Sequence, residues 1–587
     1  MYRGTLAQAL VNSTLPQGHD VGATFTHSDV KSHLNSIALK DPELYSKVAP
    51  EIKRLGDEFS TFEGLSVGLD DIEPEYKKRD PIIKRAKDKL KTAKTTKSIQ
   101  DILLDAQARM IKATSTHQGD MGLQARSGAK GNMIQLMKIV SSPIVVGGKK
   151  GAPVPYLVER GYGEGLSPAE AWIGAQEARD LGQQAALGTW APGEMQKVMA
   201  TVMSPLVVSS SDCVTSIGIL IDSAKENLEG RYLAGSNRYV DSAARRSLKG
   251  KVKVRSAMTC ELDSGVCQKC SGRDVLGKDH DIGVNAGIRS SQALTEPLTQ
   301  MTLSSKHGVS LVKGDVNKPR GLAAFKQFTE MPKSFSYKAT VADVDGEVSD
   351  ISKAPQGGFD IRISGTPHYI PPNRDLKIKK GQKVEAGDVL SSGIPNPIDI
   401  FRHKGLGAGR AYVANSLKDV YSEAGIKADP KHFEHLVKAQ FNYVKPTENM
   451  GPYMAGEVVP YSSAVKAFGE TGVRTPLKAA HGRVLTKNTL QHVAGTRIDK
   501  SLLRDFQEAG ISEVDTSDTK PKFVPVVAAA TRTPLLNPNW MQRLGFRYQK
   551  NTIIQAATEG EEASISGHDP IPGLVTGEIS RGPGGRY

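Results

Sequence analysis

The four cysteines are the residues whose spacing points most directly to chemistry. The last three fall within eleven residues, in TCELDSGVCQKC, and the full set is Cys213, Cys260, Cys267 and Cys270. A C-x2-C pair places two thiolates on one turn, and two further cysteines complete the closed tetrahedral shell of a structural zinc ion. Four unrelated buried thiols would require three of only four cysteines to cluster by chance. Because four thiolates leave no open position for water or substrate, we predict a zinc ion that fixes the fold.

The composition is that of a globular protein with several modules. The chain has 587 residues, of which 38% are hydrophobic and 24% are charged, and this length is several times that of an ordinary domain. No window approaches the roughly twenty apolar residues needed to cross a bilayer. The N-terminal stretch MYRGTLAQALVNSTLPQG lacks the continuous apolar core of a secretory signal. We therefore expect a cytoplasmic protein with no membrane span, where metal ligation by thiols is favoured over disulfides.

The charge favours an anionic partner without identifying one. The formal net charge is +14, and each phosphate neutralised by Lys or Arg releases condensed counterions. Lysine runs such as KRAKDKLKTAKTTK at 84–97 are equally typical of a solvated face. Charge alone therefore leaves nucleic acid and plain solubility as open alternatives.

The elements expected in the first part of the chain are mainly helices. Apolar spacing predicts helices over residues 1–115, interrupted by a β-like run, GLSVGLDDI, at 64–72. The segment QARSGAKGNMIQLMKIVSSPIVVG at 124–147 indicates a Gly/Ser-rich loop that leads into a helix.

One long helix is predicted from Ser167 to Met203. Ser167 stands as its N-cap, and Glu170 follows three positions later in a capping-box arrangement. Pro192 and Gly193 interrupt the pattern, so the helix should bend or locally unwind near Thr189–Gly193.

The remaining segments differ from one another in periodicity. Residues 205–280 look irregular and hold all four cysteines. Runs such as KATVADVDGEV and FDIRISG between about 330 and 400 favour antiparallel strands. Helical periodicity returns at 396–450 and at 494–560.

Eight blocks in colinear order resemble the β′ subunit of bacterial RNA polymerases. The segment GVCQKCSGRD (265–274) resembles the family's zinc knuckle, and AGIRSSQALTEPLTQMTLSSKH (286–307) resembles its trigger loop. Upstream, RLGDEFSTFEGLSVGLDDI (54–72) is similar to a segment after the active centre, SGAKGNMIQL (127–136) to the F-loop, and EGLSPAEAWIGAQEARDLGQQAALGTWAPG (164–193) to the bridge helix. Downstream, VEAGDVLSSGIPNPIDIFR (384–402) and DPKHFEHLVKAQF (429–441) resemble jaw-region blocks, and NWMQRLGFRYQKNTIIQAA (539–557) resembles a block near the family's C-terminus.

The resemblance implies a multidomain mixed α/β fold with a long bridge helix, a trigger loop, a structural zinc module, a small antiparallel β domain and a helical C-terminal region. In chain order it implies a mostly helical module after the active-centre region (1–115), an F-loop-like segment (116–160), the bridge helix (161–204), the zinc-binding module (205–280), the trigger loop with its helices (281–328), a β-rich domain (329–400), a jaw-like helical region (401–500) and a helical region near the clamp base (501–587).

The resemblance also carries residue roles onto this sequence. It implies catalytic roles beside the incoming nucleoside triphosphate for His307 and Leu303, with direct matches at Thr299 and Gln300. The family has an arginine where this chain has Ser304 and a phenylalanine at the position of Lys306. Nucleic-acid contacts are implied for Lys130, Arg179 and Thr189, whereas Gly188 and Trp190 depart from the bridge-helix pattern.

The family's catalytic aspartates have no counterpart in this sequence. The loop NADFDGD, which holds the catalytic Mg²⁺, is missing from these 587 residues, and the adjacent Asp70 and Asp71 fall in a block downstream of the active centre. Phosphoryl transfer requires such carboxylates as metal ligands. The resemblance therefore implies a DNA-directed RNA polymerase subunit that is inactive in isolation, with Mg²⁺ held by another subunit.

The partners implied by the resemblance are an N-terminal β′-type chain with the aspartate loop, β-type subunit chains, DNA template, RNA product, nucleoside triphosphates and a promoter-specificity factor. Split β′ chains of this kind are implied for large bacteriophages. One alternative is a basic zinc-containing nucleic-acid-binding protein without a catalytic role, which leaves the TEPLTQMTLSSKH block unexplained. A degenerate scaffold is the other, and the retained Gln300 and His307 argue against it.

Overall fold

The computed structural model describes residues 6–15, 26–64, 66–147, 153–188, 190–224, 226, 228–274, 277–304, 318–468, 472–519, 522–545, 548–563 and 570–577. Their contacts divide the chain into two compact units. Residues up to 188 belong to the first, and residues 190–301 together with those from 318 onward belong to the second. No helix among the described residues is both long enough and apolar enough to cross a membrane.

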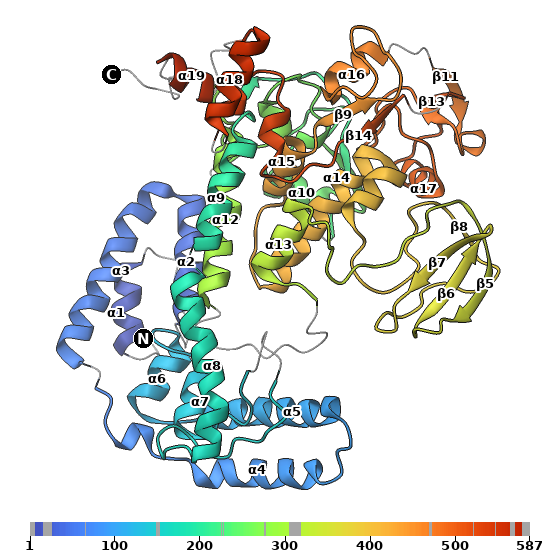
Figure 1. The fold of residues 1–587 in the computed structure, drawn as a ribbon. Coiled ribbons are helices and arrows are strands. Elements are labelled where there is room, and N and C mark those ends of the chain that lie inside the picture. Colours follow the sequence, from blue (N-terminus) through green and yellow to red (C-terminus); the bar gives the residue numbers. More distant parts are fainter. Residues whose placement is uncertain are drawn as a thin grey trace. The chain divides into compact units, whose positions relative to one another are not determined.

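The first unit is built mainly of helices. They are α1 (Leu6–Thr14), α2 (His27–Lys40), α3 (Pro42–Glu63), α4 (Tyr76–Leu90), α5 (Thr96–Thr114), α6 (Gly119–Ser127), α7 (Met133–Val140) and α8 (Pro168–Leu187), with the short 3-10 helix η1 (Asp70–Ile72). Helices α4 and α5 run side by side (Figure 1) and bury Ile83, Leu103 and Met110 against Met137 of α7.

The β-like run predicted at 64–72 is wrong. Its described residues form turns and η1, and side chains satisfy the backbone in place of a neighbouring strand. The Asp71 carboxylate accepts a hydrogen bond from the Gly68 amide at 2.9 Å, and Asp120 accepts one from the Ser66 amide at 3.1 Å. Short acidic side chains that bond to nearby amides offer the backbone this alternative to a strand ladder.

The loop predicted from residue 124 is shorter than expected. Residues up to Ser127 belong to α6, which ends at Gly128 in the left-handed conformation (φ 74°). Helix α7 then begins after Asn132, whose side chain and that of Gln135 form a reciprocal capping box.

Helix α8 begins at the predicted cap. The Ser167 amide and hydroxyl donate to one Glu170 carboxylate oxygen at 2.8 and 2.6 Å, and the other oxygen accepts from the Glu159 amide at 2.7 Å. Farther along, buried Glu177 pairs with Lys138 of α7 at 2.8 Å. These contacts hold α8 against the core of the first unit.

The long helix predicted from Ser167 to Met203 is divided into two helices, and the division falls next to the Thr189–Gly193 stretch where a bend or local unwinding was predicted. Helix α8 ends at Leu187, and α9 (Trp190–Met203) follows; Thr189 lies outside the described residues. Pro192 lies in the first turn of α9 and has no N–H to donate to the Gly188 carbonyl, so a continuous helix across this point is disfavoured. Proline is tolerated there, since the first turn of a helix needs no backbone donor.

The second unit opens with α9 and the segment that holds the cysteines. Short elements replace the irregular structure expected there: β1 (Val208–Ser210), β2 (Ile219–Asp222), α10 (Ser242–Ser247), β3 (Lys251–Val254), η3 (Ala257–Thr259), β4 (Val266–Cys267) and α11 (Gln268–Ser271). Helices α12 (Ala286–Ser304) and α13 (Gly321–Glu330) follow.

The antiparallel strands predicted between 330 and 400 are confirmed. Strands β5 (Gly346–Lys353), β6 (Phe359–Ile363), β7 (Thr366–Ile370) and β8 (Lys383–Val384) form one antiparallel sheet in the order β7-β6-β5-β8. Alternate residues of this sheet, including Val348, Ile361 and Ile370, are fully buried beneath it.

The last part of the chain mixes helices with strands that were not predicted. It contains α14 (Pro397–Glu423), α15 (Pro430–Gln440), β9 (Tyr443–Pro446), β10 (Val459–Pro460), α16 (Tyr461–Phe468), β11 (Val473–Pro476), η4 (Leu477–Ala479), β12 (Val484–Leu485), α17 (Lys500–Glu508), β13 (Glu513–Ser517), β14 (Phe523–Pro525), η5 (Thr533–Leu536), η6 (Gln542–Leu544), α18 (Gln549–Glu559) and α19 (Pro570–Thr576). The helical periodicity predicted for 494–560 is therefore confirmed only in part, by α17 and α18, whereas β13 and β14 between them are strands. Strands β13 and β14 pair with strands from residues 443–485, and such distant partners cannot be recognised from local periodicity.

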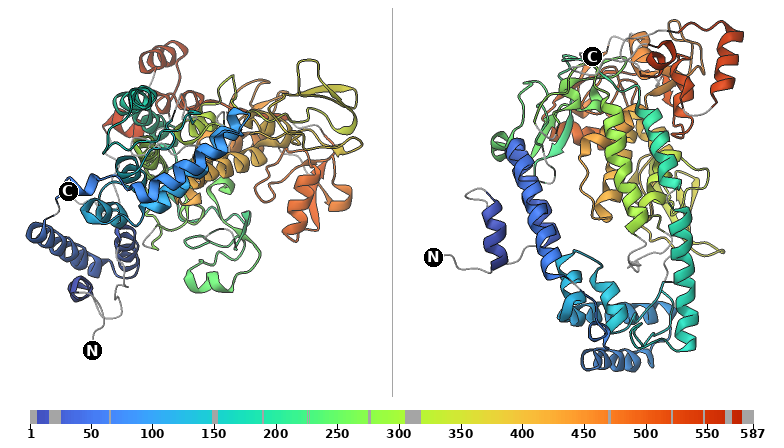
Figure 2. Two further views of the ribbon diagram at one scale, coloured as in Figure 1. Left: turned by 90° about the horizontal axis from the view of Figure 1, so that it is seen from below. Right: turned by 90° about the vertical axis from the view of Figure 1, so that its left-hand side faces the viewer.

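Helices α9 and α12 lie side by side in the second unit, as both Figure 1 and the right-hand view of Figure 2 show. The start of α12 meets the end of α9 at Gly287, where an added Cβ would stand only 1.8 Å from the Met203 carbonyl oxygen. Only glycine fits at this point, because the α9 backbone occupies the space of a side chain.

We predict that Gly287→Ala lowers the stability of the second unit by about 2–3 kcal/mol, because the two helices must separate to admit the methyl group. Thermal unfolding measures the effect as a lower melting temperature. Gly193→Ala is the matched control, since nothing lies within 4 Å of its Cβ position and alanine favours a helix by up to about 1 kcal/mol. Equal melting temperatures for Gly287→Ala and the unmodified chain would contradict the close approach.

Candidate metal centre and the helices around it

The four cysteines predicted to bind metal converge in the second unit. Their sulfur atoms all lie within 4.8 Å of one another, and the Sγ atoms of Cys213 and Cys270 are 3.7 Å apart. A tetrahedral zinc ion with Zn–S bonds of about 2.3 Å holds its sulfurs about 3.8 Å apart. The cluster could therefore hold a metal ion, and its dimensions are compatible with zinc.

Local backbone geometry brings the sulfurs together. Strands β1 and β4 pair in parallel, which places Cys267 opposite Ser210 and so near the segment that holds Cys213. The turn before β4 needs Gly265, since its φ is 72° and a Cβ would stand 2.3 Å from the Val207 carbonyl oxygen. The Cys267 sulfur then caps α11 by accepting from the Cys270 amide at 3.4 Å.

Arg255 forms a second layer around the cluster. Its guanidinium donates to the sulfurs of Cys213, Cys270 and Cys267 at 3.2, 3.3 and 3.5 Å. The same group pairs with Asp212 at 2.8 Å, and its side chain is completely buried. A cation held against thiolates stabilises their charged form, and such outer contacts orient the ligands of a metal.

The thiols cannot all ionise without a cation between them. Hydrogen bonds from Cys260, and then from Cys267 and Cys270, lower the pKa of Cys213. Contact with Cys213 raises the pKa of Cys267, but Cys260 and Cys270 outweigh it and lower that pKa to about 6. The pKa values of Cys260 and Cys270 are raised, first by their contact with Cys213. A divalent metal ion would displace the remaining protons.

Helix α15 carries buried polar residues that hold this module. Glu434 pairs with Arg231, with one contact at 2.9 Å, and accepts a hydrogen bond from the Ser256 hydroxyl at 2.6 Å. One turn later the Lys438 ammonium donates to the Cys260 carbonyl at 3.1 Å. The helix thus contacts both the segment just before Cys260 and Cys260 itself.

The same helix also anchors α12. The ring of His435 is buried, with Nδ1 2.8 Å from the Ser290 hydroxyl of α12 and Nε2 3.3 Å from the Ser271 hydroxyl of α11. His432 Nδ1 lies 2.9 Å from the same Ser290 oxygen. Burial holds the pKa of His435 well below its usual range, so the ring is neutral and can donate from one nitrogen while it accepts at the other.

The other predicted residues are distributed over both units. Thr299 and Gln300 lie in the last turns of α12, where Thr299 donates to the Thr295 carbonyl at 3.2 Å and Gln300 is exposed. Leu303 belongs to the same helix, without a described side-chain position, and His307 lies outside the described residues. In the first unit, Arg179 of α8 and Lys130 of the α6–α7 loop are both exposed; Thr189 lies outside the described residues.

Sequence reasoning missed the residues that support the cluster and α12. Arg255 stands only five positions before Cys260, and a cation near clustered thiolates is a signal that could have been used. The buried set on α15 offered less, because Glu434, His435 and Lys438 look like the polar face of an exposed helix.

Comparisons with known proteins agree with the resemblance in the sequence. Residues 165–357 match the family model of RNA polymerase Rpb1, domain 5. The β′ subunit of DNA-directed RNA polymerase from Moorella thermoacetica is 26% identical over 97% of this chain and 49% of its own length. That of Heliobacterium modesticaldum is 28% identical over 89% and 44%, and that of Tropheryma whipplei is 26% identical over 91% and 44%. The chain thus spans about half the length of these curated relatives.

We predict about one zinc ion per chain, and we predict that Cys267→Ser loses it. The change removes the ligand that links β4 to α11, and three remaining thiolates hold zinc more weakly and leave the module unfolded. Elemental analysis and protease sensitivity measure the two effects. Ser264→Ala, an exposed change in the same loop, should keep the metal. A folded protein with no zinc, or a Cys267→Ser variant with full zinc content, would contradict the assignment.

Proposed function

We propose that this chain, a relative of the C-terminal part of β′-type RNA polymerase subunits, supplies the bridge helix and the trigger loop of a DNA-directed RNA polymerase. The observation that carries the proposal is the continuous match over 165–357. That stretch contains α8, α9, the four-cysteine cluster and α12, in the order that the resemblance implies. The alternative of a zinc-containing nucleic-acid-binding protein does not account for this order.

Helices α8 and α9 take the place of the bridge helix in this proposal. Arg179 and Lys130 are both exposed. Their cationic groups are therefore accessible to nucleic-acid phosphates. Thr189 is assigned to the same surface by its match to the family pattern. Trp190, which is 70% exposed, offers an aromatic face on which a base could stack.

Helices α12 and α13 flank the segment assigned to the trigger loop. The first half of α12 is fixed, because Ser290 meets the two histidines of α15 and the Leu294 carbonyl accepts from buried Tyr421 of α14. Thr299 and Gln300 lie beyond these anchors, toward the end of the helix. Because the first half of α12 is fixed, the side chains of Thr299 and Gln300 have a defined position, which supports a positioning role in nucleotide addition.

His307 is proposed as the charged or proton-donating group beside the triphosphate. An imidazole can donate to phosphate oxygens or protonate the leaving pyrophosphate. Leu303 is assigned to pack on the incoming base. Because Ser304 replaces the family's arginine, more of the stabilisation of the triphosphate falls on His307 and Lys306.

The catalytic Mg²⁺ is proposed to be held outside these 587 residues. The sequence contains no NADFDGD-like loop, and carboxylates are the ligands that Mg²⁺ requires. We assign them to a separate β′-type chain that assembles with this one, with β-type chains and with DNA. We assign this split to the form of the enzyme implied for large bacteriophages. Zinc in this chain is proposed to have a structural role.

We predict that the isolated chain does not extend an RNA primer on a DNA template and becomes active only on assembly. The reason is the missing carboxylate cluster. Affinity purification followed by mass spectrometry should recover a chain with a NADFDGD-like loop and a β-like chain. Primer extension by the purified chain alone, in the absence of these partners, would contradict the split.

We predict that His307→Ala slows single-nucleotide addition by about ten- to a thousandfold, with an effect toward the larger value because Ser304 offers no second cation. The rate is measured at saturating nucleotide in a preassembled elongation complex, so promoter recognition does not contribute. His27→Ala, at an exposed histidine of α2, is the matched control. An unchanged rate would leave His307 without a catalytic role.

A further inference from the structure

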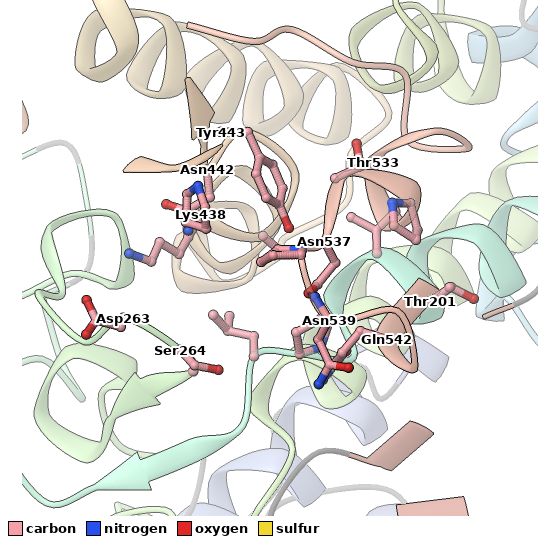
Figure 3. Close-up of a pocket in the computed structure, with 18 residues that line it drawn as sticks. Thr201, Asp263, Ser264, Lys438, Asn442, Tyr443, Thr533, Asn537, Asn539 and Gln542 are labelled. Atoms are coloured by element: carbon pink, nitrogen blue, oxygen red, sulfur yellow. Dashed lines mark hydrogen bonds between the residues drawn. The ribbon is translucent and has the colours of Figure 1, made fainter. Parts of the chain in front are cut away.

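A cavity of about 290 Å³ lies beside the metal-binding module, within the second unit. Its walls come from the end of α9, the loop 263–265 between two of the cysteines, the end of α15 and the segment 533–542 (Figure 3). The volume is near the lower limit of small-molecule sites. None of the residues assigned to polymerase chemistry lines it.

The cavity wall contains a buried ammonium with few partners. Lys438 is only 7% exposed, and its one described hydrogen bond goes to a neutral acceptor, the Cys260 carbonyl, at 3.1 Å. No carboxylate among the described residues pairs with it. An ammonium has three N–H donors, so two of them remain to attract an anion.

A second buried cation lies behind the same wall. Arg410 is 2% exposed and donates to the Phe441 carbonyl and the Asn442 side-chain oxygen, both at 2.8 Å. These acceptors are also neutral. Asn442 lines the cavity, and because its oxygen is taken by Arg410, its amino group is left as a donor. Burial lowers the pKa of Arg410 to about 10.

Nearby negative charges are already matched by other groups. Asp263 is the only acid among the described residues that line the cavity, and its carboxylate pairs with Lys466. The thiolates of the cluster are contacted directly by Arg255. Lys438 reaches only a carbonyl of the cluster, so neither acidic group neutralises it by contact.

The opposite wall offers an unpaired amide. Gln542 is 5% exposed, and its side-chain oxygen is buried without a hydrogen-bond partner in the described structure. Figure 3 places Gln542 and Asn539 together across the cavity from Lys438. Unsatisfied buried amides are rare in native proteins. Because the Gln542 oxygen has almost no accessible surface, a polar ligand in the cavity would reach it only after the amide turns toward the cavity.

We propose that this cavity binds a small ligand whose oxyanion group, a phosphate or a carboxylate, pairs with Lys438 and Asn442 and whose polar body reaches Gln542. The loop 263–265 joins two metal ligands and also forms one wall of the cavity. Occupancy therefore stabilises the metal module by linkage, since a ligand that binds the folded state opposes its unfolding. The proposal is independent of the polymerase function.

The test uses the full-length, zinc-loaded chain with sodium phosphate, sodium malonate or sodium chloride at constant ionic strength. Phosphate or malonate is expected to raise the melting temperature in a saturable way and to slow zinc transfer to a chelator several-fold, and the more effective anion identifies the oxyanion class. Lys438→Met should abolish both responses, whereas Lys445→Met, at an exposed lysine on β9, should keep them. General salting-out effects act equally on all variants.

A second variant guards against a folding defect in Lys438→Met. Gln542→Leu removes the amide but no charge. It should weaken binding, so that the half-saturating concentration of the effective anion rises about tenfold while the zinc content stays unchanged. The proposal is overturned if neither phosphate nor malonate gives a saturable response. It is also overturned if Lys438→Met, or Gln542→Leu, responds like the unmodified chain.

Discussion

The buried pair between Glu434 and Arg231 is the contact on which the second unit depends. Both side chains are almost completely inaccessible, at 6% and 2% exposed, and the carboxylate also accepts from the Ser256 hydroxyl. Loss of one partner from a buried pair costs about 3–5 kcal/mol, which is a large share of the stability of an ordinary domain. Helix α15 is thus fixed in one register against the segment that leads into the cysteines.

The cysteine cluster and helix α15 both hold the segment around Cys260. Cys213 and Cys260 are far apart in the sequence, so a metal ion that joins them closes a long loop and restricts the unfolded chain. The Lys438 contact to the Cys260 carbonyl and the His435 contact to Ser271 then dock the closed module onto α15. Metal binding at this cluster would therefore stabilise the docking of the helix, and the docked helix would favour metal binding, because each orders residues that the other needs.

Local features were predictable from the sequence, and non-local ones were not. The Ser167–Glu170 cap and the antiparallel strands near 346–370 each depend on residues within a short stretch. The cysteine cluster was recognisable because three of its four members lie within eleven residues. Strand β13 depends on partners at 473–476 and 484–485, which no local pattern specifies. Arg255 was missed for a related reason, since its role appears only when three sulfurs gather around one guanidinium.

Helix α15 shows why the burial of polar residues is difficult to predict from the sequence. Glu434, His435 and Lys438 suggest a solvated face, yet all three are buried because other segments supply matching donors and acceptors. Hydrogen bonds are directional, so this interface accepts one position of α12, whereas an apolar interface would tolerate small shifts. In the proposed polymerase role, α12 would hold Thr299 and Gln300 at a defined position, and that selectivity would serve this role. Polar contacts at Ser290 and Leu294 thus fix the first half of α12, and this fixes the direction in which the helix carries the exposed Gln300 near its other end.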